Sequence, residues 1–285
     1  MHHVSKIDKA SAQTPDGYQK HSTGFRRATY VDRSVGSVHM GTGICFLEPS
    51  GTIESHVHAF EETFYILEGS VLVQIDGKAF ALGPGHFGLV GTGKSHAFRA
   101  LGNQSVRWLE MQAPQPRLID YGRDTFFVGG EVPTQAAPPD LADAANSMLG
   151  HFDESQLPRP GAPSEMEGFN PTTGVAIKMF VDRSHGSVHQ SLFLIQYMPG
   201  AKIDPHDHTF EESYFIVSGI VEAIADGEKH LLEAGSVIWT SVGCIHSFTN
   251  VGSEPVRWIE TQAPLPPSAE VFRFERDWAK YSTSA

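Results

Sequence analysis

The chain has 285 residues, of which 40% are hydrophobic and 19% are charged, and its formal net charge is −12 at pH 7. These are the proportions of a globular protein, and they exclude a chain that is disordered throughout. The acidic balance, with no cluster of Lys and Arg, argues against a nucleic-acid partner and against an anionic membrane surface.

Residues 1–24 are polar, and we expect them to form an N-terminal arm. They contain no apolar segment typical of a secretory signal, and no run of about 18 apolar residues predicts a membrane span. Cys45 and Cys244 do not occupy matching positions in the repeat described below, so we expect no disulfide framework. Together these features predict a cytoplasmic protein.

From Phe25 onward the chain consists of short β-rich runs interrupted by Gly and Pro, which predicts an all-β fold. The run over residues 71–75 ends at Asp76-Gly77, a strong hairpin signal, and Asp226-Gly227 stands at the matching place later in the chain. Amphipathic helices are not interleaved with these runs, so a sandwich or small barrel is favoured over a parallel α/β sheet.

A pattern of histidines and a glutamate occurs twice, offset by 150 residues, since 206 − 56 and 246 − 96 both equal 150. The first copy contains His56, His58, Glu62 and His96, and the second contains His206, His208, Glu212 and His246. The same offset relates residues 30–34 to 180–184 and residues 106–108 to 256–258, which indicates a duplicated domain. We expect an arm over 1–24, domain 1 over 25–115, a linker over 116–174, domain 2 over 175–265 and a C-terminal tail over 266–285.

The linker is rich in Pro and Ala. Within it we consider a short helix over residues 140–148 that is capped by Asp140. The conformation of the C-terminal tail is left open between a strand and a helix.

Each copy of the pattern can surround one divalent metal ion. Side chains alternate along a strand, so His206, His208 and Glu212 share a face if the segment is extended, which favours Glu212 over Glu211 as a ligand. Imidazole and carboxylate ligands suit iron or manganese, with nickel, copper or zinc as alternatives, and four protein ligands leave one or two coordination positions open. We expect up to one ion in each domain, and the alternative is a set of hydrogen-bonded core histidines.

Further side chains accompany both sets of ligands. The candidates for an apolar pocket wall are Phe60, Phe98, Phe210 and Phe248, for which ordinary core packing is the alternative. The candidates for acid–base or ligand-orienting roles are Glu110, Glu260, Gln112, Gln262 and Tyr214. The sequence does not decide whether Glu110 and Gln112 or the apolar Leu109 and Met111 face the interior. Tyr214 replaces Phe64 of the first copy, so the two pockets differ if this side chain points inward.

The motifs resemble those of the cupin superfamily. Gly200, His206, His208, Glu212 and Gly219 match its first motif without a gap, and Gly235, Gly243, His246 and Asn250 match the second. In the first copy the leading glycine is Gly51, one position late, and Ala100 replaces the asparagine; Gly91 and Ser241 replace the proline of the second motif. These departures lie in turns rather than at ligands. The resemblance implies a bicupin, with a double-stranded β-helix, or jelly roll, in each half.

The resemblance also implies a class of activity. A ligand set of three histidines and one glutamate is similar to those of quercetin dioxygenases and germin-like proteins, so we expect an oxidoreductase, a mononuclear non-haem dioxygenase. Its substrate would be a small aromatic or enolic oxygenated molecule that chelates the metal. Alternatives are a cupin isomerase, decarboxylase or hydrolase that uses the metal as a Lewis acid, or a non-catalytic cupin that binds a metal or small ligand. Edge strands leave room for pairing into a homodimer.

Overall fold

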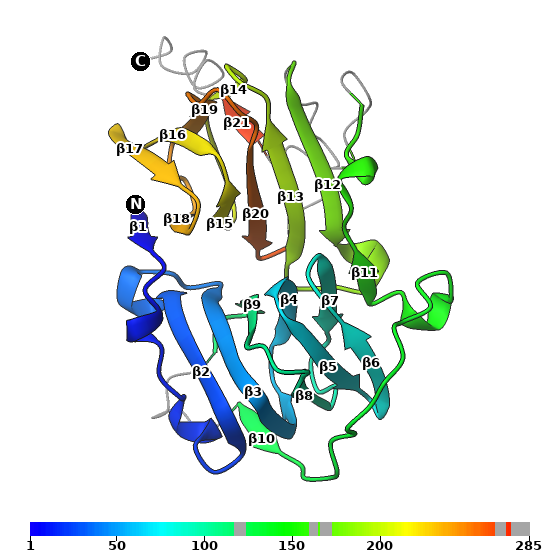
Figure 1. The fold of residues 1–285 in the computed structure, drawn as a ribbon. Helices are drawn as coiled ribbons and strands as arrows, with labels where there is room; N and C mark the ends of the chain where they lie inside the picture. Colours follow the sequence, from blue (N-terminus) through cyan, green and yellow to red (C-terminus); the bar gives the residue numbers. More distant parts are fainter. Residues whose placement is uncertain (117–123, 160–164, 166–172, 266–271, 275–285) are drawn as a thin grey trace.

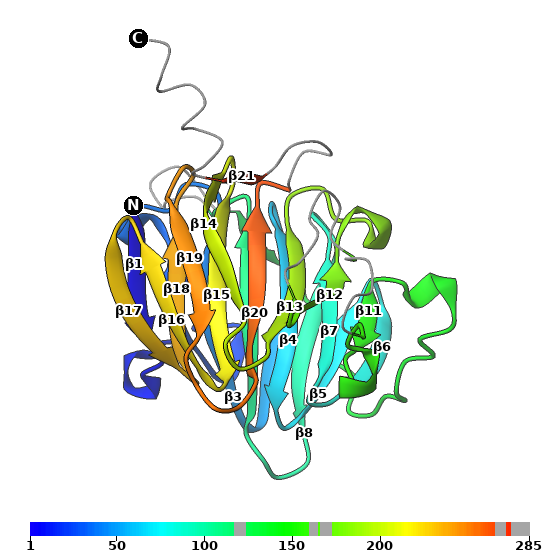
Figure 2. The same ribbon diagram turned by 90° about the horizontal axis from the view of Figure 1, so that it is seen from above.

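The computed structural model describes residues 1–116, 124–159, 165, 173–265 and 272–274. Two all-β barrels lie one above the other, with domain 2 uppermost in Figure 1, and Figure 2 shows the same strands from above. The helical segments within the described residues are 3-10 turns of three residues each, and none is long and apolar enough to cross a membrane. The prediction of an all-β chain of two jelly-roll domains is confirmed.

Domain 1 is built around one long strand. Its strands are β2 (Ser22–Val31), β3 (Gly41–His58), β4 (Glu61–Glu68), β5 (Ser70–Ile75), β6 (Lys78–Leu82), β7 (His86–Val90), β8 (His96–Leu101) and β9 (Val106–Ala113). They form a sheet in the order β7-β4-β9-β3-β8-β5-β6, with β2 also paired to β3. The first half of β3 pairs with β9 and its second half with β8, so this strand bends from one side of the barrel to the other.

Domain 2 repeats this arrangement with its long strand divided into two. Its strands are β12 (Val175–Val181), β13 (Ser191–Tyr197), β14 (Lys202–His208), β15 (Glu211–Ser218), β16 (Ile220–Ala225), β17 (Glu228–Glu233), β18 (Ser236–Thr240), β19 (His246–Asn250) and β20 (Val256–Ala263). Gly200, with φ at 77°, lies in the turn between β13 and β14, and Ser50 of β3 adopts the same left-handed conformation with φ at 63°. The bend is therefore kept in domain 1 even though its glycine stands one position later.

The hairpins predicted at the two Asp-Gly pairs are confirmed. Ile75 pairs with Lys78, and Ala225 pairs with Glu228, so each turn has a two-residue loop. Asp76 and Gly77 have φ values of 47° and 82°, and the second copy has nearly the same values, as a type I′ turn requires.

The barrels exchange strands. β1 (His2–Lys6) precedes domain 1 but pairs with β18 of domain 2, whereas β11 (Leu149–His151) precedes domain 2 but pairs with β7 of domain 1. The segment expected to be an arm and the segment expected to be a linker thus each add an edge strand to the opposite barrel. The short helix considered over residues 140–148 is a 3-10 turn, Ala144–Asn146, and its cap is Asp143 rather than Asp140.

One short strand follows each barrel in the sequence and pairs with the strand that carries the first two histidines of that barrel. β10 (Thr125–Phe127) pairs with the end of β3, and β21 (Phe272–Phe274) pairs with β14 at His206–His208. The C-terminal tail therefore contains a strand, while its other residues lie outside the described part of the chain. Both additions lie beside the ends of the strands that carry the first two histidines of each copy.

An apolar interface joins the two barrels. Its cluster contains residues of both domains, and Phe180 of domain 2 stacks on Phe87 and Tyr65 of domain 1 at ring-centroid distances of 4.3 and 5.6 Å. Separate apolar clusters fill the interior of each barrel. Several strands are consequently buried on both faces, with one face in the barrel and the other at the interface.

Candidate metal centres

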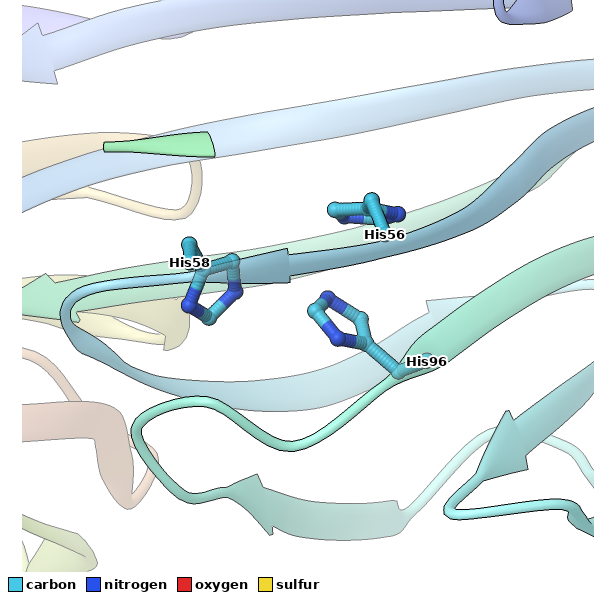
Figure 3. A group of neighbouring side chains, drawn as sticks. All are labelled: His56, His58 and His96. Carbon is cyan, nitrogen blue, oxygen red and sulfur yellow. The ribbon is translucent and has the colours of Figure 1, made fainter. Parts of the chain in front are cut away.

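The first centre lies inside domain 1, where the ends of three strands meet. His56 and His58 are at the end of β3, Glu62 is at the start of β4, and His96 begins β8. The three imidazoles are buried and point toward one another (Figure 3), with one nitrogen of each lying within 4.8 Å of the others. The structure therefore brings together the three histidines that the repeat singled out.

A bulge in the strand aims the first histidine. Ile53 pairs with Phe98 and His56 pairs with His96, so the pairing of β3 with β8 shifts its register between these positions. Without the shift, residues 53 and 56 would point to opposite faces; with it, both side chains point into the barrel. The same irregularity occurs between Ile203 and His206 in domain 2.

Hydrogen bonds fix which nitrogen of each ring is available. In domain 1 the Nδ1 atoms of His56, His58 and His96 lie 2.8, 2.7 and 3.1 Å from the carbonyl oxygens of Glu54, Phe60 and Lys94. A carbonyl can only accept, so Nδ1 carries the proton and Nε2 keeps its lone pair. The second copy has the same three bonds, each at 2.9 Å, from His206, His208 and His246. A hydrogen bond from the nitrogen that does not bind the metal fixes the orientation of a metal-binding imidazole.

Glu62 completes the first centre and leaves polar atoms unsatisfied. Its Oε2 lies 3.2 Å from His58 Nε2 and 3.6 Å from His96 Nε2. Among the described residues, Glu62 Oε1 and His96 Nε2 are buried without any hydrogen-bond partner. Two orphaned atoms of this kind are costly in a barrel interior, and a divalent cation would satisfy both. The residues present therefore fit a metal ion.

The second centre has the same ligands and one additional side chain. Glu212 Oε2 lies 2.6 Å from His208 Nε2 and 3.3 Å from His246 Nε2, and Gln262 donates to Glu212 Oε1 at 2.8 Å. The hydroxyl of Tyr214 bonds to Glu212 and lies 3.0 Å from His246 Nε2. Tyr214 therefore points inward, and the two centres differ chemically because Phe64 holds its place in domain 1.

Burial lowers the pKa of one histidine at each centre. Burial, assisted by His246, lowers the pKa of His206 to about 3, and burial together with His96 lowers the pKa of His56 well below its ordinary value. Both rings are therefore neutral near pH 7, which is the form that binds a metal.

A cavity of about 210 Å³ adjoins the centre of domain 1. Glu110 and Gln112 line it, so the polar side of β9 faces the barrel, while Leu109 and Met111 pack in the interface cluster. Gln112 pairs across the sheet with Glu62, which places the cavity beside the ligands.

Tyr18 and Arg27 also line this cavity and were not identified from the sequence. Tyr18 contacts the His56 ring at 5.4 Å, and Arg27 forms an ion pair with Glu110. Position 27 corresponds to Ile177 in the repeat, but residues 25–29 and 175–179 are identical at no position, so this difference gave no signal in the sequence.

The cavity of domain 2 is much smaller, about 30 Å³. Ile177, Tyr214 and Glu260 are among the residues that line it, and this volume holds only about two water molecules. Burial raises the pKa of Glu260 well above its ordinary value, and the charge of Glu212 adds to this effect. Glu260 accepts a hydrogen bond from Trp258 Nε1 at 2.9 Å, whereas among the described residues the equivalent Trp108 Nε1 has no partner.

The four phenylalanines expected to wall the pockets divide into two roles. Phe60 and Phe210 lie flat against the rings of His58 and His208, each at a centroid distance of 4.0 Å. Phe98 and Phe248 belong to the barrel cores, where each meets a tryptophan and the edge of the third histidine. Phe60 also lines the cavity of domain 1, and Phe248 lines that of domain 2.

The family described as Cupin domain matches twice, at residues 43–111 and 193–261, and these matches correspond to the two halves of the repeat. The chain belongs to the cupin superfamily. With one cupin domain in each half, it is a bicupin.

Two curated relatives match lengths close to that of one domain. Polyketide synthase CurC of Streptomyces cyaneus is 29% identical over 146 residues, which are 50% of this chain and 86% of that protein. Tetracenomycin polyketide synthase protein TcmJ of Streptomyces glaucescens is 29% identical over 111 residues, which are 39% of this chain and 71% of that protein.

Solved structures resemble the whole bicupin. Oxalate decarboxylase of Lactobacillus farciminis, in a formate complex, has a TM-score of 0.67 at 16% identity and covers 99% of this chain and 90% of its own. A variant of salicylate 1,2-dioxygenase of Pseudoaminobacter salicylatoxidans, in complex with gentisate, has a TM-score of 0.69 at 15% identity, covering 92% and 82%. At these identities the likeness establishes the shared fold.

The different positions of the two glutamines give a prediction for metal affinity. Gln262 orients Glu212, so Gln262→Ala is expected to weaken metal binding in domain 2 by about 10- to 100-fold. Zn(II) competition against a chromogenic chelator measures this in a background carrying His56→Ala and His58→Ala, where only domain 2 can bind. The matched control is Gln112→Ala in a background carrying His206→Ala and His208→Ala, where only domain 1 can bind. Gln112 bonds to Glu110 rather than to Glu62, so a much smaller change in metal affinity is expected there. Equal changes in the two domains would contradict this assignment.

Proposed function

We propose that this bicupin is a metal-dependent enzyme, and that its reaction is the dioxygenation of a small oxygenated metabolite of aromatic or enolic character. The observation that carries the proposal is the pairing, in domain 1, of an unsatisfied histidine and carboxylate with an adjoining cavity of about 210 Å³. A metal centre with open positions beside a ligand-sized cavity is the arrangement that a chelated substrate requires.

The residues of domain 1 have distinct parts in this proposal. His56, His58, Glu62 and His96 would hold the ion, which when bound supplies a Lewis acid and, if redox-active, a route for electrons between substrate and dioxygen. Phe60 covers one face of His58 and gives the cavity an apolar wall that limits water. Burial raises the pKa of Glu110 despite its ion pair with Arg27, so this carboxylate is a stronger base than a free glutamate and could accept a proton from a substrate in the cavity.

The curated relatives support the substrate class. Both carry names that place them with polyketide synthases. Polyketides as a chemical class are rich in phenol, enol and β-dicarbonyl oxygens, and such oxygen pairs chelate divalent metals. A substrate of this type would match a centre that has two open positions.

Oxygen uptake tests the proposal. The protein is loaded with iron(II), manganese(II) or nickel(II), and a panel of catechols, flavonols and β-diketones is offered in an oxygen-electrode cell. We expect substrate-dependent oxygen consumption with at least one metal and one class, and its loss when His56, His58, His206 and His208 are all replaced by alanine. Tight binding of an unmodified metabolite without turnover under any metal would instead indicate a non-catalytic binding protein.

A non-oxidative reaction is the second candidate, and domain 2 favours it. Glu260 and Tyr214 both lie beside the second centre, and burial raises the pKa of each well above its ordinary value. Both groups therefore release a proton less readily than the free side chains do, and they could serve proton transfer in an isomerase, decarboxylase or hydrolase that uses the metal as a Lewis acid. Conversion of a substrate in the same panel without oxygen uptake would favour this candidate.

A further inference from the structure

Three metal-binding side chains meet at one edge of domain 2 and share no residue with the two centres described above. They are His2 on β1 and Glu228 and His230 on β17, and their ligand atoms all lie within 4.8 Å of one another. The side chains of His2 and His230 are 11% and 24% exposed, whereas Glu228 is 72% exposed. The two rings are therefore largely shielded, and the cluster is open to solvent on the side of the carboxylate.

The exchange of β1 between the barrels brings these residues together. β1 pairs with β18, with His2 opposite Thr240, and this pairing places His2 in contact with β17 (Figure 2). Glu228 and His230 are two residues apart on β17, so alternation turns both side chains to the same face. Neither strand carries all three ligands, so the cluster exists only where β1 has joined domain 2.

The spacing of the three ligand atoms suits a metal ion better than a hydrogen-bonded network. His2 Nε2 lies 2.9 Å from His230 Nε2 and 3.6 Å from Glu228 Oε2, and His230 Nε2 lies 4.0 Å from the same oxygen. Ligands of a tetrahedral ion bound at about 2.0–2.1 Å are ~3.3 Å apart, which falls within this range. A carboxylate that is hydrogen-bonded to a charged imidazole lies about 2.7–2.9 Å from the nitrogen, and Glu228 approaches neither ring so closely.

The second nitrogen of His2 faces another carboxylate. His2 Nδ1 lies 3.7 Å from Asp226 Oδ2, which favours a proton on Nδ1 and leaves the lone pair of Nε2 directed at the cluster. Asp226 itself pairs with the amino terminus at 2.6 Å. The other group that includes His2, with Asp226 and Cys244, is therefore the weaker candidate for a metal ion.

Domain 1 does not repeat this cluster. Lys78 and Phe80 of β6 stand at the positions that match Glu228 and His230, and neither offers a ligand of this kind. A metal ion bound at the edge of domain 2 would thus be independent of the repeated centres inside the barrels.

From these observations we infer that His2, Glu228 and His230 form a third metal site, which takes a borderline divalent cation such as Zn(II) and fastens β1 to domain 2. Two imidazoles and one carboxylate are a ligand set that Zn(II) accepts, with water in the fourth position. Since only three side chains bind the ion and one of them is exposed, the site fills only when the metal is supplied. We therefore expect it to lose its ion during purification without added metal, and to be too weak to compete with the chelator used for the barrel centres.

Zinc binding tests the inference in a chain whose barrel centres have been removed. The full chain is used, with alanine in place of four histidines: His56, His58, His206 and His208. It is dialysed against micromolar Zn(II), and the bound zinc is counted by elemental analysis. We expect one ion per chain, and at least tenfold weaker binding when His2→Ala or His230→Ala is added.

His3 provides the matched control because it is the next residue on β1. Its side chain points to the opposite face of the strand, and it belongs to none of the candidate metal groups among the described residues. His3→Ala should therefore leave zinc binding unchanged. Loss of zinc binding in His3→Ala would show that the first residues of the chain capture the ion by themselves, and it would overturn the inference.

A second measurement keeps the barrel centres intact and does not depend on the folding of the multiple variant. With both centres loaded, further Zn(II) should slow hydrogen exchange of the backbone amides of residues 2–6 at least fivefold, because an ion bound to β1 and β17 opposes the detachment of β1. Mass spectrometry of the peptide that contains these residues measures the rate. His230→Ala lies outside this peptide and should abolish the slowing.

Three further outcomes would overturn the inference. They are no zinc binding at submillimolar Zn(II) in the folded variant without barrel centres, zinc binding that survives both His2→Ala and His230→Ala, and an exchange rate of residues 2–6 that Zn(II) does not change. The inference is independent of the proposed reaction, which uses the centres inside the barrels. Absence of oxygen uptake would therefore leave it intact.

Discussion

Replacing His206 and His208 together with alanine should remove one of two bound metal ions, because both imidazoles present Nε2 to the same centre in domain 2. The His56→Ala and His58→Ala pair should remove the other ion, and all four substitutions together should reduce metal content to near zero. The loss at each centre is expected to be nearly complete, since two of four ligands cannot hold an ion against exchange with solvent. Elemental analysis of protein purified without added metal measures the content.

The control for this experiment is a histidine outside both centres. His185 lies in a 3-10 turn next to Asp182 and is 29% exposed, so His185→Ala should leave the metal content unchanged. A content near zero after the domain 2 substitutions alone would show that only this domain binds. Unchanged content in the variant with all four substitutions would refute the assignment of both centres.

Replacing Glu61 with alanine should lower the free energy of unfolding by roughly 2–4 kcal/mol, because it leaves buried donors of the opposite barrel without an acceptor. Glu61 accepts from Ser187 Oγ at 2.7 Å and from the backbone N–H groups of Val188 and His189 at 2.8 and 2.9 Å. Urea unfolding followed by tryptophan fluorescence measures the loss. Glu61→Gln keeps one acceptor oxygen, so a smaller loss is expected.

The reciprocal contact makes the prediction testable twice. Glu211 of domain 2 accepts from Ser37 Oγ at 2.6 Å and from the backbone N–H groups of Val38 and His39 at 2.8 and 3.3 Å. Glu211→Ala should therefore destabilise the protein to a similar extent. Glu131→Ala, at an exposed position, serves as the control and should change little. A loss for the control equal to that for Glu61→Ala would argue against a specific contact between the barrels.

Much of the candidate site could be predicted from the sequence because strand periodicity is a local property. Alternation along an extended segment favoured Glu212 over Glu211, and the structure places Glu212 against two imidazoles while Glu211 points to the other barrel. The repeat then indicated the matching residues of domain 1. Alternation did not account for the bulge before His56, which adds a residue to one strand and depends on pairing with β8.

The orientation of β9 could not be decided from sequence for a physical reason. One face of this strand lies inside the barrel and the other packs against the second domain, so apolar residues occur on both faces. The usual contrast between a buried apolar face and a solvated polar face is therefore missing. Only the packing of the barrels shows that Glu110 and Gln112 face the cavity and that Leu109 and Met111 face the interface.

The sequence by itself determined the all-β class, the duplication, the Asp-Gly hairpins and the eight candidate ligands, because each depends on residue type and spacing within a short segment. The tertiary structure decided the exchange of β1 and β11, the contacts of Glu61 and Glu211 across the interface, and the approach of Tyr18 and Arg27 to the first centre. These features join residues that are far apart in the chain. Such contacts arise only when both barrels are folded and packed, so no local pattern in the sequence encodes them.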